Sequence, residues 1–302
     1  MKRSILGVLL VLTFVAVGIA AAPPLTFTFS DVHSTRTATE TDSYGVNNNG
    51  VIAGDYVDAK GVQHAMILAG TKVTTVNHAN CVTSGGSAAG AIAFYGINTA
   101  DAVVGWCKDT VTAQADGFMY AKGKLTAVNF PKSTGTEPTG INDKGWIVGL
   151  YFDAAKVQHG FLKKGTKYTS IDVTGDTSAA AWGINNAGDI TVYAVNAAGT
   201  AYDSFLYNGK TFKKISDPKA AGLGTVVHTP NNKGDICGTY YANSTSTETH
   251  GFLFHGGKYY NVDDPKGPTL SRNDGLNDSL EMVGRYTPTG KTNSVGFKVT
   301  TK

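Results

Sequence analysis

Six copies of one short pattern run through the chain, and their spacing restricts the fold more than any other feature of the sequence. Five copies have a glycine, a hydrophobic residue and an asparagine, followed by a turn and a hydrophobic strand, and the fifth in chain order is degenerate and reads Thr229-Pro230-Asn231. The copies end at Asn47, Asn98, Asn142, Asn185, Asn231 and Asn277. These asparagines lie 51, 44, 43, 46 and 46 positions apart. Such a period, with several short strands in each unit, is typical of a β-propeller.

The third copy shows most clearly what one unit contains. Residues 139–142 predict a first strand, and the turn that follows holds Gly145, which can adopt the positive φ that such turns need. Residues 146–151, 159–163 and 167–173 predict three further strands. The unit is therefore expected to be a four-stranded antiparallel meander, with strands a, b, c and d in chain order. One such sheet cannot bury its hydrophobic face alone, so neighbouring units must stack.

The two ends of the chain predict a closed ring. The sixth copy stops at Lys302 after strand c and lacks strand d, whereas residues 25–32 have strand character with no earlier strand before them. This N-terminal segment is similar to strand d of the third copy. By completing the last blade it would remove the exposed sheet edges of an open array. We therefore expect an all-β, six-bladed β-propeller of four-stranded antiparallel blades, the last completed by the N-terminal strand.

The first 22 residues have the pattern of a secretory signal peptide. Lys2 and Arg3 precede an uncharged apolar stretch, residues 5–20, and small alanines follow it. A membrane anchor is the alternative, but the stretch is shorter than the ~20 residues that a spanning helix needs. We expect residues 23–302 to form one secreted domain, extracellular or periplasmic, with no membrane association after cleavage.

The charge balance gives no reason to expect nucleic acid as a partner. The chain has 26 lysines and arginines against 23 aspartates and glutamates, a formal net charge of +3. Removing Lys2 and Arg3 leaves a charge of +1, too little for electrostatic binding to a polyanion.

One longer motif resembles a known family. Residues 140–149 read GINDKGWIVG and are followed by HGFL at 159–162, and a second match runs over 231–238 with HGFL at 250–253. These residues resemble the extracellular HAF-repeat family, and the resemblance covers nearly the whole chain after residue 22. It implies a secreted repeat protein with a propeller-like fold. The family has no general function and no catalytic residues to carry over.

The two faces of such a ring differ in sequence. The a–b and c–d connections, on one face, are uniform short turns. The b–c and d–a connections, on the other face, vary and include residues 77–93, 108–115, 217–226 and 243–249. Variable loops on a repetitive scaffold usually carry binding, so a ligand is expected on this second face.

Aromatic residues recur near the end of strand b and form the candidate ligand-binding set. They are Tyr56, Tyr151, Tyr240 and Tyr286, with Trp106 one residue before the equivalent position. Rings near a loop rim provide platforms for sugars, but they also pack well between blades with a polar tip outward. The simpler interpretation of these aromatic residues is that they pack between blades, and the functional interpretation is that they bind carbohydrate.

Three cysteines cannot all pair within one chain. Cys81 lies in the longest d–a connection and Cys107 near the end of the following strand b, so this pair is a candidate disulfide. Cys237 falls within a strand b, where a buried free thiol is expected.

Histidines recur at the start of strand c, and acidic or amide residues recur just after strand b. The histidines, His64, His159 and His250, are too far apart on outer strands for a metal ring, so we expect structural hydrogen bonds. The residues after strand b are expected to open Asx turns rather than to bind calcium. No metal and no cofactor are predicted.

Three functions remain open at this point. The first is a secreted, non-catalytic binding or adhesion module for an extracellular glycan or protein. The second is a hydrolase or lyase with its active site at the channel mouth, and the third is a structural surface or matrix protein. No catalytic motif and no paired carboxylates stand outside the repeats. A propeller can nevertheless build a site from one residue per blade, and such a site leaves no linear motif. The oligomeric state is not predicted.

Overall fold

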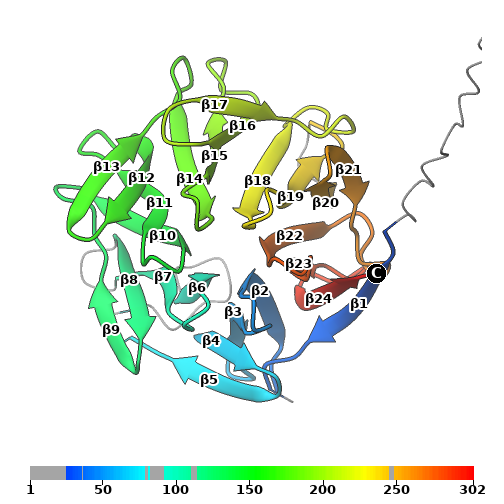
Figure 1. The fold of residues 1–302 in the computed structure, drawn as a ribbon. Helices are drawn as coiled ribbons and strands as arrows, with labels where there is room; N and C mark the ends of the chain where they lie inside the picture. Colours follow the sequence, from blue (N-terminus) through cyan, green and yellow to red (C-terminus); the bar gives the residue numbers. More distant parts are fainter. Residues whose placement is uncertain (1–24, 36, 79–80, 82–91, 110–113, 245–247) are drawn as a thin grey trace, which may run out of the picture.

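The computed structural model is a ring of six four-stranded antiparallel sheets around a central channel (Figure 1). It describes residues 25–302 apart from 36, 79–80, 82–91, 110–113 and 245–247. The predicted signal peptide, residues 1–22, lies outside the described residues. Within the described ranges there is no helix with the length and hydropathy of a membrane span.

Each blade contains its strands in the simple order a, b, c, d from the channel outward. Blade one has β2 (Glu40–Val46), β3 (Ile52–Val57), β4 (Gln63–Ala69) and β5 (Lys72–Val76). Blade two has β6 (Ala93–Ile97), β7 (Val103–Lys108), β8 (Ala115–Ala121) and β9 (Lys124–Ala127). Blade three has β10 (Gly135–Ile141), β11 (Ile147–Phe152), β12 (Gln158–Lys164) and β13 (Lys167–Ile171). Blade four has β14 (Ser178–Ile184), β15 (Ile190–Val195), β16 (Tyr202–Tyr207) and β17 (Phe212–Ile215). Blade five has β18 (Thr225–Pro230), β19 (Ile236–Tyr241), β20 (Thr249–His255) and β21 (Lys258–Asn261).

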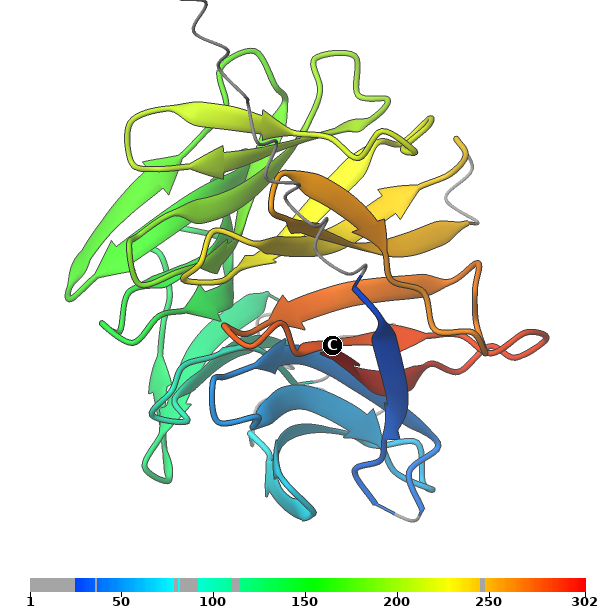
Figure 2. The ribbon, with the colours of Figure 1, turned by 45° about the vertical axis from the view of Figure 1, so that its right-hand side comes forward.

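Blade six is built from both ends of the chain. It has β22 (Ser271–Leu276), β23 (Met282–Tyr286) and β24 (Val295–Thr301), and its outer strand is the N-terminal β1 (Phe27–Val32). The register of β1 against β24 runs from Phe27 opposite Thr301 to Val32 opposite Gly296. Figure 2 shows β1, in dark blue, beside the red C-terminal strand. The predicted six-bladed ring and its mode of closure are confirmed.

The repeated phenylalanines of strand c pack between blades, opposite a glycine of strand b. Phe161 and Phe252 are fully buried, and their register partners are Gly149 and Gly238. A Cβ on Gly238 would lie 2.6 Å from the Phe252 ring. The glycine therefore makes room for the aromatic ring that fills the core of the blade.

The anchor asparagines form a closed hydrogen-bonded ring, which we call the Asn ring. The Nδ2 of each asparagine donates to the backbone carbonyl of the next one, at 2.9, 3.2, 2.9, 3.2, 3.2 and 3.0 Å around the circle. Its Oδ1 accepts from its own turn, as that of Asn142 does from the N–H groups of Lys144 and Trp146. One side chain thus closes a turn and joins two blades.

The glycine two positions before five of the six ring asparagines is required by the close approach of neighbouring inner strands. A Cβ built on Gly45 would lie 2.5 Å from the carbonyl oxygen of Tyr95 in the next blade, closer than real contacts allow. The inner strands approach one another at this point, so the Asn ring can close only where side chains are absent or small. In the degenerate fifth copy, Thr229 replaces the glycine, and its hydroxyl donates a hydrogen bond to the carbonyl of Asp274 at 2.7 Å.

The inner strands are longer than the sequence predicts, and each carries a β-bulge. In blade three the strand covers Gly135–Ile141, not only residues 139–142, and its register shifts between Pro138 and Gly140. The same shift occurs in all six inner strands. A bulge leaves a residue out of the ladder and re-aims its side chain.

Candidate functional site at one mouth of the channel

The bulges place one variable side chain per blade at the channel. The bulged residue lies three positions before the ring asparagine, and the six residues are Tyr44, Tyr95, Thr139, Trp182, His228 and Asp274. Tyr95 and Trp182 belong to blades two and four, yet their rings contact at a centroid distance of 5.9 Å. Blade three lies between these blades (Figure 1). A contact between the rings of blades two and four therefore requires both side chains to reach into the channel.

Further aromatic residues extend this contact into a continuous aromatic belt. The belt consists of Tyr44, Tyr95, Trp106, Trp182, Tyr193, Tyr202 and Tyr241. Successive centroids lie 4.5 Å apart for Tyr44 and Tyr95 and 6.0 Å apart for Trp182 and Tyr193. All members except Tyr241 are half-buried, so their rings are held in place and still reach solvent.

A pair of buried carboxyl groups lies next to the belt. Asp42 and Asp55 are direct register partners on β2 and β3, with only 6% and 3% of their surfaces exposed. Tyr44 donates its hydroxyl to Asp42 Oδ2 at 3.1 Å, and Ser294 also donates to Asp42. Burial raises the pKa of both aspartates, and the charge of Asp42 raises that of Asp55 further. Of the two carboxyl groups, Asp55 has the more strongly raised pKa and so favours its protonated form more.

Arg285 connects these acids to the belt. Its guanidinium lies 4.8 Å from the centre of the Tyr44 ring and 3.4 Å from Asp274 Oδ2. Asp274 in turn lies 3.2 Å from Nδ1 of His228, whose pKa burial lowers, so the imidazole stays neutral near pH 7. Arg285 is thus held by a cation–π contact and an ion pair.

Glu137 is a half-buried carboxyl group without a hydrogen-bond partner among the described residues. It lies on β10, two positions before the bulged Thr139, on the channel side of blade three. Burial raises the pKa of Glu137 to about 7. A carboxyl group of this kind can donate or accept a proton near neutral pH.

These groups open on the variable face of the ring. A pocket with an empty volume of about 830 Å³ lies where blades five, six and one meet, and its lining includes Asp42, Tyr44, Arg272 and Arg285. It also includes Thr292 in the b–c connection of blade six. We call the belt together with Asp42, Asp55, Glu137, Arg272 and Arg285 the channel site.

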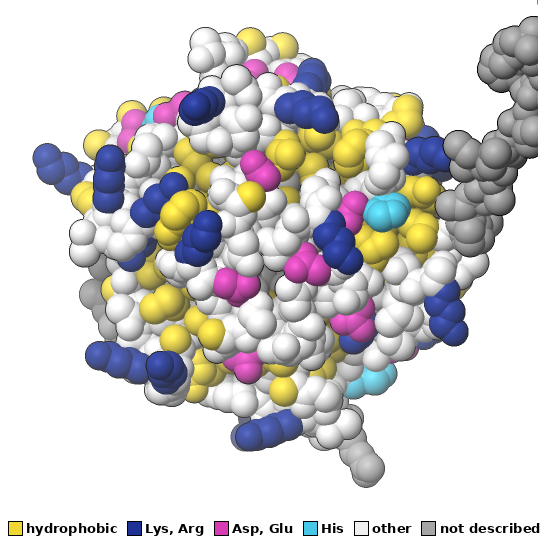
Figure 3. Space-filling model, viewed as in Figure 1, with side chains coloured by type: hydrophobic (Ala, Val, Ile, Leu, Met, Phe, Trp, Pro, Cys, Tyr) yellow, Lys and Arg dark blue, Asp and Glu magenta, His cyan; other side chains and the backbone are white. Residues whose placement is uncertain are grey.

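The opposite mouth is built differently. A pocket of about 590 Å³ there is lined by the ring asparagines and the residues that follow them. These following side chains bind one another between blades, as Asn186 does with Asp143 at 2.7 Å and Asn232 with Asp278 at 2.9 Å. Their polar groups are already satisfied by the scaffold, whereas several of those in the channel site are not. The face seen in Figure 3 mixes acidic, basic and hydrophobic side chains without one large patch of a single charge.

The structure separates the five aromatic residues selected from the sequence. Tyr56, Tyr240 and Tyr286 are buried between strands, with 7%, 4% and 3% exposure. Their hydroxyls bond Thr75, Asn261 and Asp31. Tyr151 stacks on Phe130 at 3.7 Å and is likewise part of the packing. The binding role of these four tyrosines stays a prediction, and the channel site does not use them.

Trp106 lies on the opposite side of strand b from the four tyrosines. It pairs with Ala93 in register, as Asp55 pairs with Asp42, and its ring is parallel to Tyr95 at 6.2 Å. It therefore belongs to the belt. Tyr44, Tyr95 and Trp182 were missed because they occupy the bulged position, at which the six copies differ, and no linear motif marks it. The other belt residues, Tyr193, Tyr202 and Tyr241, lie on β15, β16 and β19 and do not recur in the repeat either.

The recurrent histidines form structural hydrogen bonds. Nδ1 of His159 lies 2.7 Å from Asp172, and the ring stacks on Tyr151 at 5.1 Å. His64 and His250 have the same arrangement with Asn77 and Asp263. These contacts tie strand c to the end of strand d within one blade.

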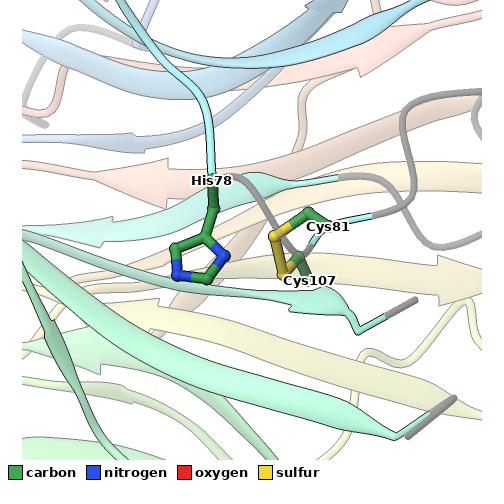
Figure 4. Close-up of side chains that lie close together, drawn as sticks. All are labelled: His78, Cys81 and Cys107. Atoms are coloured by element: carbon green, nitrogen blue, oxygen red, sulfur yellow. A yellow bond between two sulfur atoms is a disulfide. The ribbon is translucent and has the colours of Figure 1, made fainter. Parts of the chain in front are cut away.

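Cys81 and Cys107 are joined by a disulfide, with Cα atoms 5.6 Å apart. It lies in the core of blades one and two, and Cys237 is a buried free thiol. His78 lies beside the disulfide, with its imidazole near the two sulfur atoms (Figure 4). Because the sulfurs bond each other, this group of three does not offer two thiolates to a metal.

Solved structures with a similar fold include a lectin, the protein AofleA and a sialidase. A mutant of Aleuria aurantia lectin in complex with Fucα1-6GlcNAc superimposes with a TM-score of 0.55 at 11% identity, over 89% of this chain and 96% of the lectin. AofleA from Arthrobotrys oligospora gives 0.53 at 10% identity, over 91% and 85%. The chain shares their six-bladed propeller fold.

A Hadza microbial sialidase is similar with a TM-score of 0.53 at 9% identity, over 87% of this chain and 66% of the sialidase. At these identities the likeness is one of fold. No family profile matches the sequence, and no curated protein does.

Proposed function

We propose that the protein is a secreted, non-catalytic carbohydrate-binding propeller that holds its ligand in the channel site. The observation that carries this proposal is the aromatic belt: half-buried rings, fixed by one another, next to polar groups that lack partners within the described residues. Sugars combine apolar ring faces with hydroxyl groups, so they match rigid aromatic platforms surrounded by carboxyl and guanidinium groups.

The structural neighbours support this proposal in a general way. Aleuria aurantia lectin and AofleA have the same fold, and the lectin is solved with Fucα1-6GlcNAc. Export through residues 1–22 and membership of the HAF-repeat family belong to the same proposal and rest on the sequence motifs. N-terminal sequencing of exported protein tests the first of these, and a mature chain that still begins at Met1 would contradict it.

Binding is tested with residues 23–302 on a glycan array, followed by titration of the saccharides that bind. Trp182→Ala removes the ring at the centre of the belt and should weaken binding by tenfold or more, since stacking contacts contribute about 1–3 kcal/mol. Trp146→Ala is the matched control, because Trp146 lies outside the channel site and packs beneath Lys164 at 3.5 Å. An array with no bound glycan, or equal affinities for both variants, would overturn the proposal.

Glu137 favours one second candidate, a glycoside hydrolase at the same site. Its pKa of about 7 suits a general acid, and the Asp42–Asp55 pair supplies further carboxyl groups at the channel mouth. Release of reducing ends from a glycan that binds, abolished in Glu137→Gln, would establish hydrolysis. Binding without turnover over long incubation would leave the lectin-like function.

A further inference from the structure

Arginine is rare in this chain, and the two arginines that the structure describes lie side by side in the channel site. The sequence has four arginines, of which Arg3 and Arg36 lie outside the described residues. Arg272 and Arg285 are direct register partners on β22 and β23, and both line the pocket of about 830 Å³. Their side chains therefore leave the sheet on the same side, about 5 Å apart at Cβ.

Only one of the two guanidinium groups has a partner among the described residues. Arg285 is paired with Asp274 and lies over Tyr44. Arg272 is also half-buried, but it has no ion pair and no hydrogen bond with the rest of the described chain. Losing hydration without gaining a partner is costly for a cation, so this group is suited to an anionic partner from outside.

Two phenols of the belt, those of Tyr193 and Tyr202, lie within electrostatic reach of Arg272, and Tyr241 stacks on the second of them. The Tyr193 and Tyr202 rings contact at 5.8 Å, and those of Tyr202 and Tyr241 stack at 6.0 Å. Burial raises the pKa of Tyr193 and of Tyr202, and the charge of Arg272 opposes that rise in both. These two hydroxyls therefore stay protonated and can donate hydrogen bonds.

The phenol hydroxyls are also available. Those of Tyr193, Tyr202 and Tyr241 bond no other residue in the described ranges. A guanidinium group with neighbouring O–H donors and no carboxylate paired to it fits the geometry and charge of a carboxylate, which accepts from a guanidinium in bidentate fashion.

We propose that the channel site takes a saccharide that carries a carboxylate, and that Arg272 with the hydroxyls of Tyr193, Tyr202 and Tyr241 forms its carboxylate subsite. This inference rests on the proposed function and specifies the ligand class. Tyr95 and Trp182, in the middle of the belt, stack on the apolar face of a sugar ring while the subsite holds its acid group.

The first experiment uses the wild-type mature chain and two pairs of ligands in calorimetry. One pair is trigalacturonate and its methyl ester, and the other is sialyllactose and lactose, so the two arms separate uronic acids from sialic acids. In at least one arm the free acid should bind tenfold or more tightly than its uncharged counterpart, and added salt should reduce that preference. Equal affinity within both pairs would overturn the carboxylate subsite while leaving the proposed carbohydrate binding intact. Failure of all neutral and acidic saccharides to bind, here and on the array, would overturn the proposed function itself.

The second experiment assigns the preference to Arg272. Arg272→Gln should lose about tenfold in affinity for the acid and a smaller factor for the uncharged ligand, so that the preference for the acid falls, and Arg272→Lys should fall between. Lys291→Gln is the control, an exposed cation in the b–c connection of the same blade. Unchanged acid preference in Arg272→Gln would overturn the assignment. Tyr202→Phe, which removes one hydroxyl and no charge, gives a second reading if the arginine variant does not fold.

Discussion

Thr26 and Lys302 exchange two backbone hydrogen bonds, with the N–H of each donating to the carbonyl of the other at 3.0 and 3.1 Å. They are 276 positions apart, and they stand side by side at the end of the antiparallel pair that β1 forms with β24. Blade six is therefore held together by an ordinary β-ladder, although it lacks the covalent turn that links strands c and d in every other blade.

A circular permutant should consequently retain the fold. The permuted chain begins at Ala38, runs to Lys302, and continues through an Asn-Gly turn into residues 26–35, which makes β24 and β1 a two-residue hairpin. Circular dichroism and thermal unfolding should match the parent chain within about 1 kcal/mol, because no native contact of the ladder is removed. A permutant that aggregates or loses its β-signal would contradict this view of the closure.

Removing β1 without replacing it should have the opposite effect. A chain that starts at Ala38 leaves β24 as an exposed hydrophobic edge and uncovers Phe297 and Val299, which are fully buried. Such edges pair with other chains. We expect this truncation to associate in size-exclusion chromatography, and a stable monomer would show that β1 is dispensable.

The Asn ring should contribute measurably to stability at each of its members. Asn142→Ala removes a donor to the carbonyl of Asn185 and an acceptor for two N–H groups of its own turn, all in a buried setting. Unfolding in urea should show a loss of about 2–4 kcal/mol, since each unsatisfied buried group costs on the order of 1–3 kcal/mol. Asn49→Ala, at an exposed site in the equivalent turn of blade one, should cost less than about 1 kcal/mol. Equal losses in the two variants would contradict a special role for the ring.

The disulfide should stabilise the domain by restricting the unfolded chain. Cys81 and Cys107 are 26 positions apart, and a loop of this size gives about 3 kcal/mol in the chain-entropy description. Cys81→Ser should lower the free energy of unfolding by this amount, and a reducing agent should destabilise the wild-type chain but not the variant. A non-reducing peptide map that shows Cys81 as a free thiol would contradict the pairing.

Glu137 should make stability depend on pH in a defined direction. Burial raises its pKa from 4.5 to about 7, so the folded chain binds this proton more tightly than the unfolded chain does. Its favourable contribution is fully present below about pH 4.5 and is lost as the pH rises towards 7. Relative to wild type, Glu137→Gln should gain about 1–3 kcal/mol between pH 5 and pH 8. Parallel unfolding profiles for the two chains over this range would show that the carboxyl group is not perturbed.

Much of the scaffold could be predicted from the sequence because the same physical demands recur in each blade. The close approach of inner strands calls for a small residue such as Gly45, the turn and the Asn ring call for Asn47, and the blade core calls for residues such as Phe161. Because each requirement recurs in every blade, the same type of residue recurs at the same spacing in the sequence. The pairing of β1 with β24 was predictable for the related reason that one strand was missing and one was left over.

The candidate site could not be predicted in the same way. Tyr95 and Trp182 stand at equivalent positions, but Thr139 occupies that position in the blade between them, so no pattern repeats. Tyr56 and its equivalents lie away from the channel because alternate residues of a strand face opposite sides of the sheet, and their binding role stays a prediction. Trp106, displaced by one position, lies on the channel side for this reason. Aligning the six copies at the third residue before each asparagine identifies Tyr44, Tyr95 and Trp182, but not the belt residues of the other strands.

The bulge on each inner strand also affects how such a protein can diversify. The bulged residue has no partner in the strand ladder, so its side chain can be exchanged while every inter-strand hydrogen bond remains. Tyr, Thr, Trp, His and Asp already occupy the six equivalent positions. Point mutation at a bulge would therefore deliver one new channel residue at a time to an unchanged framework, and exchange of whole blades between related genes would replace several channel residues together.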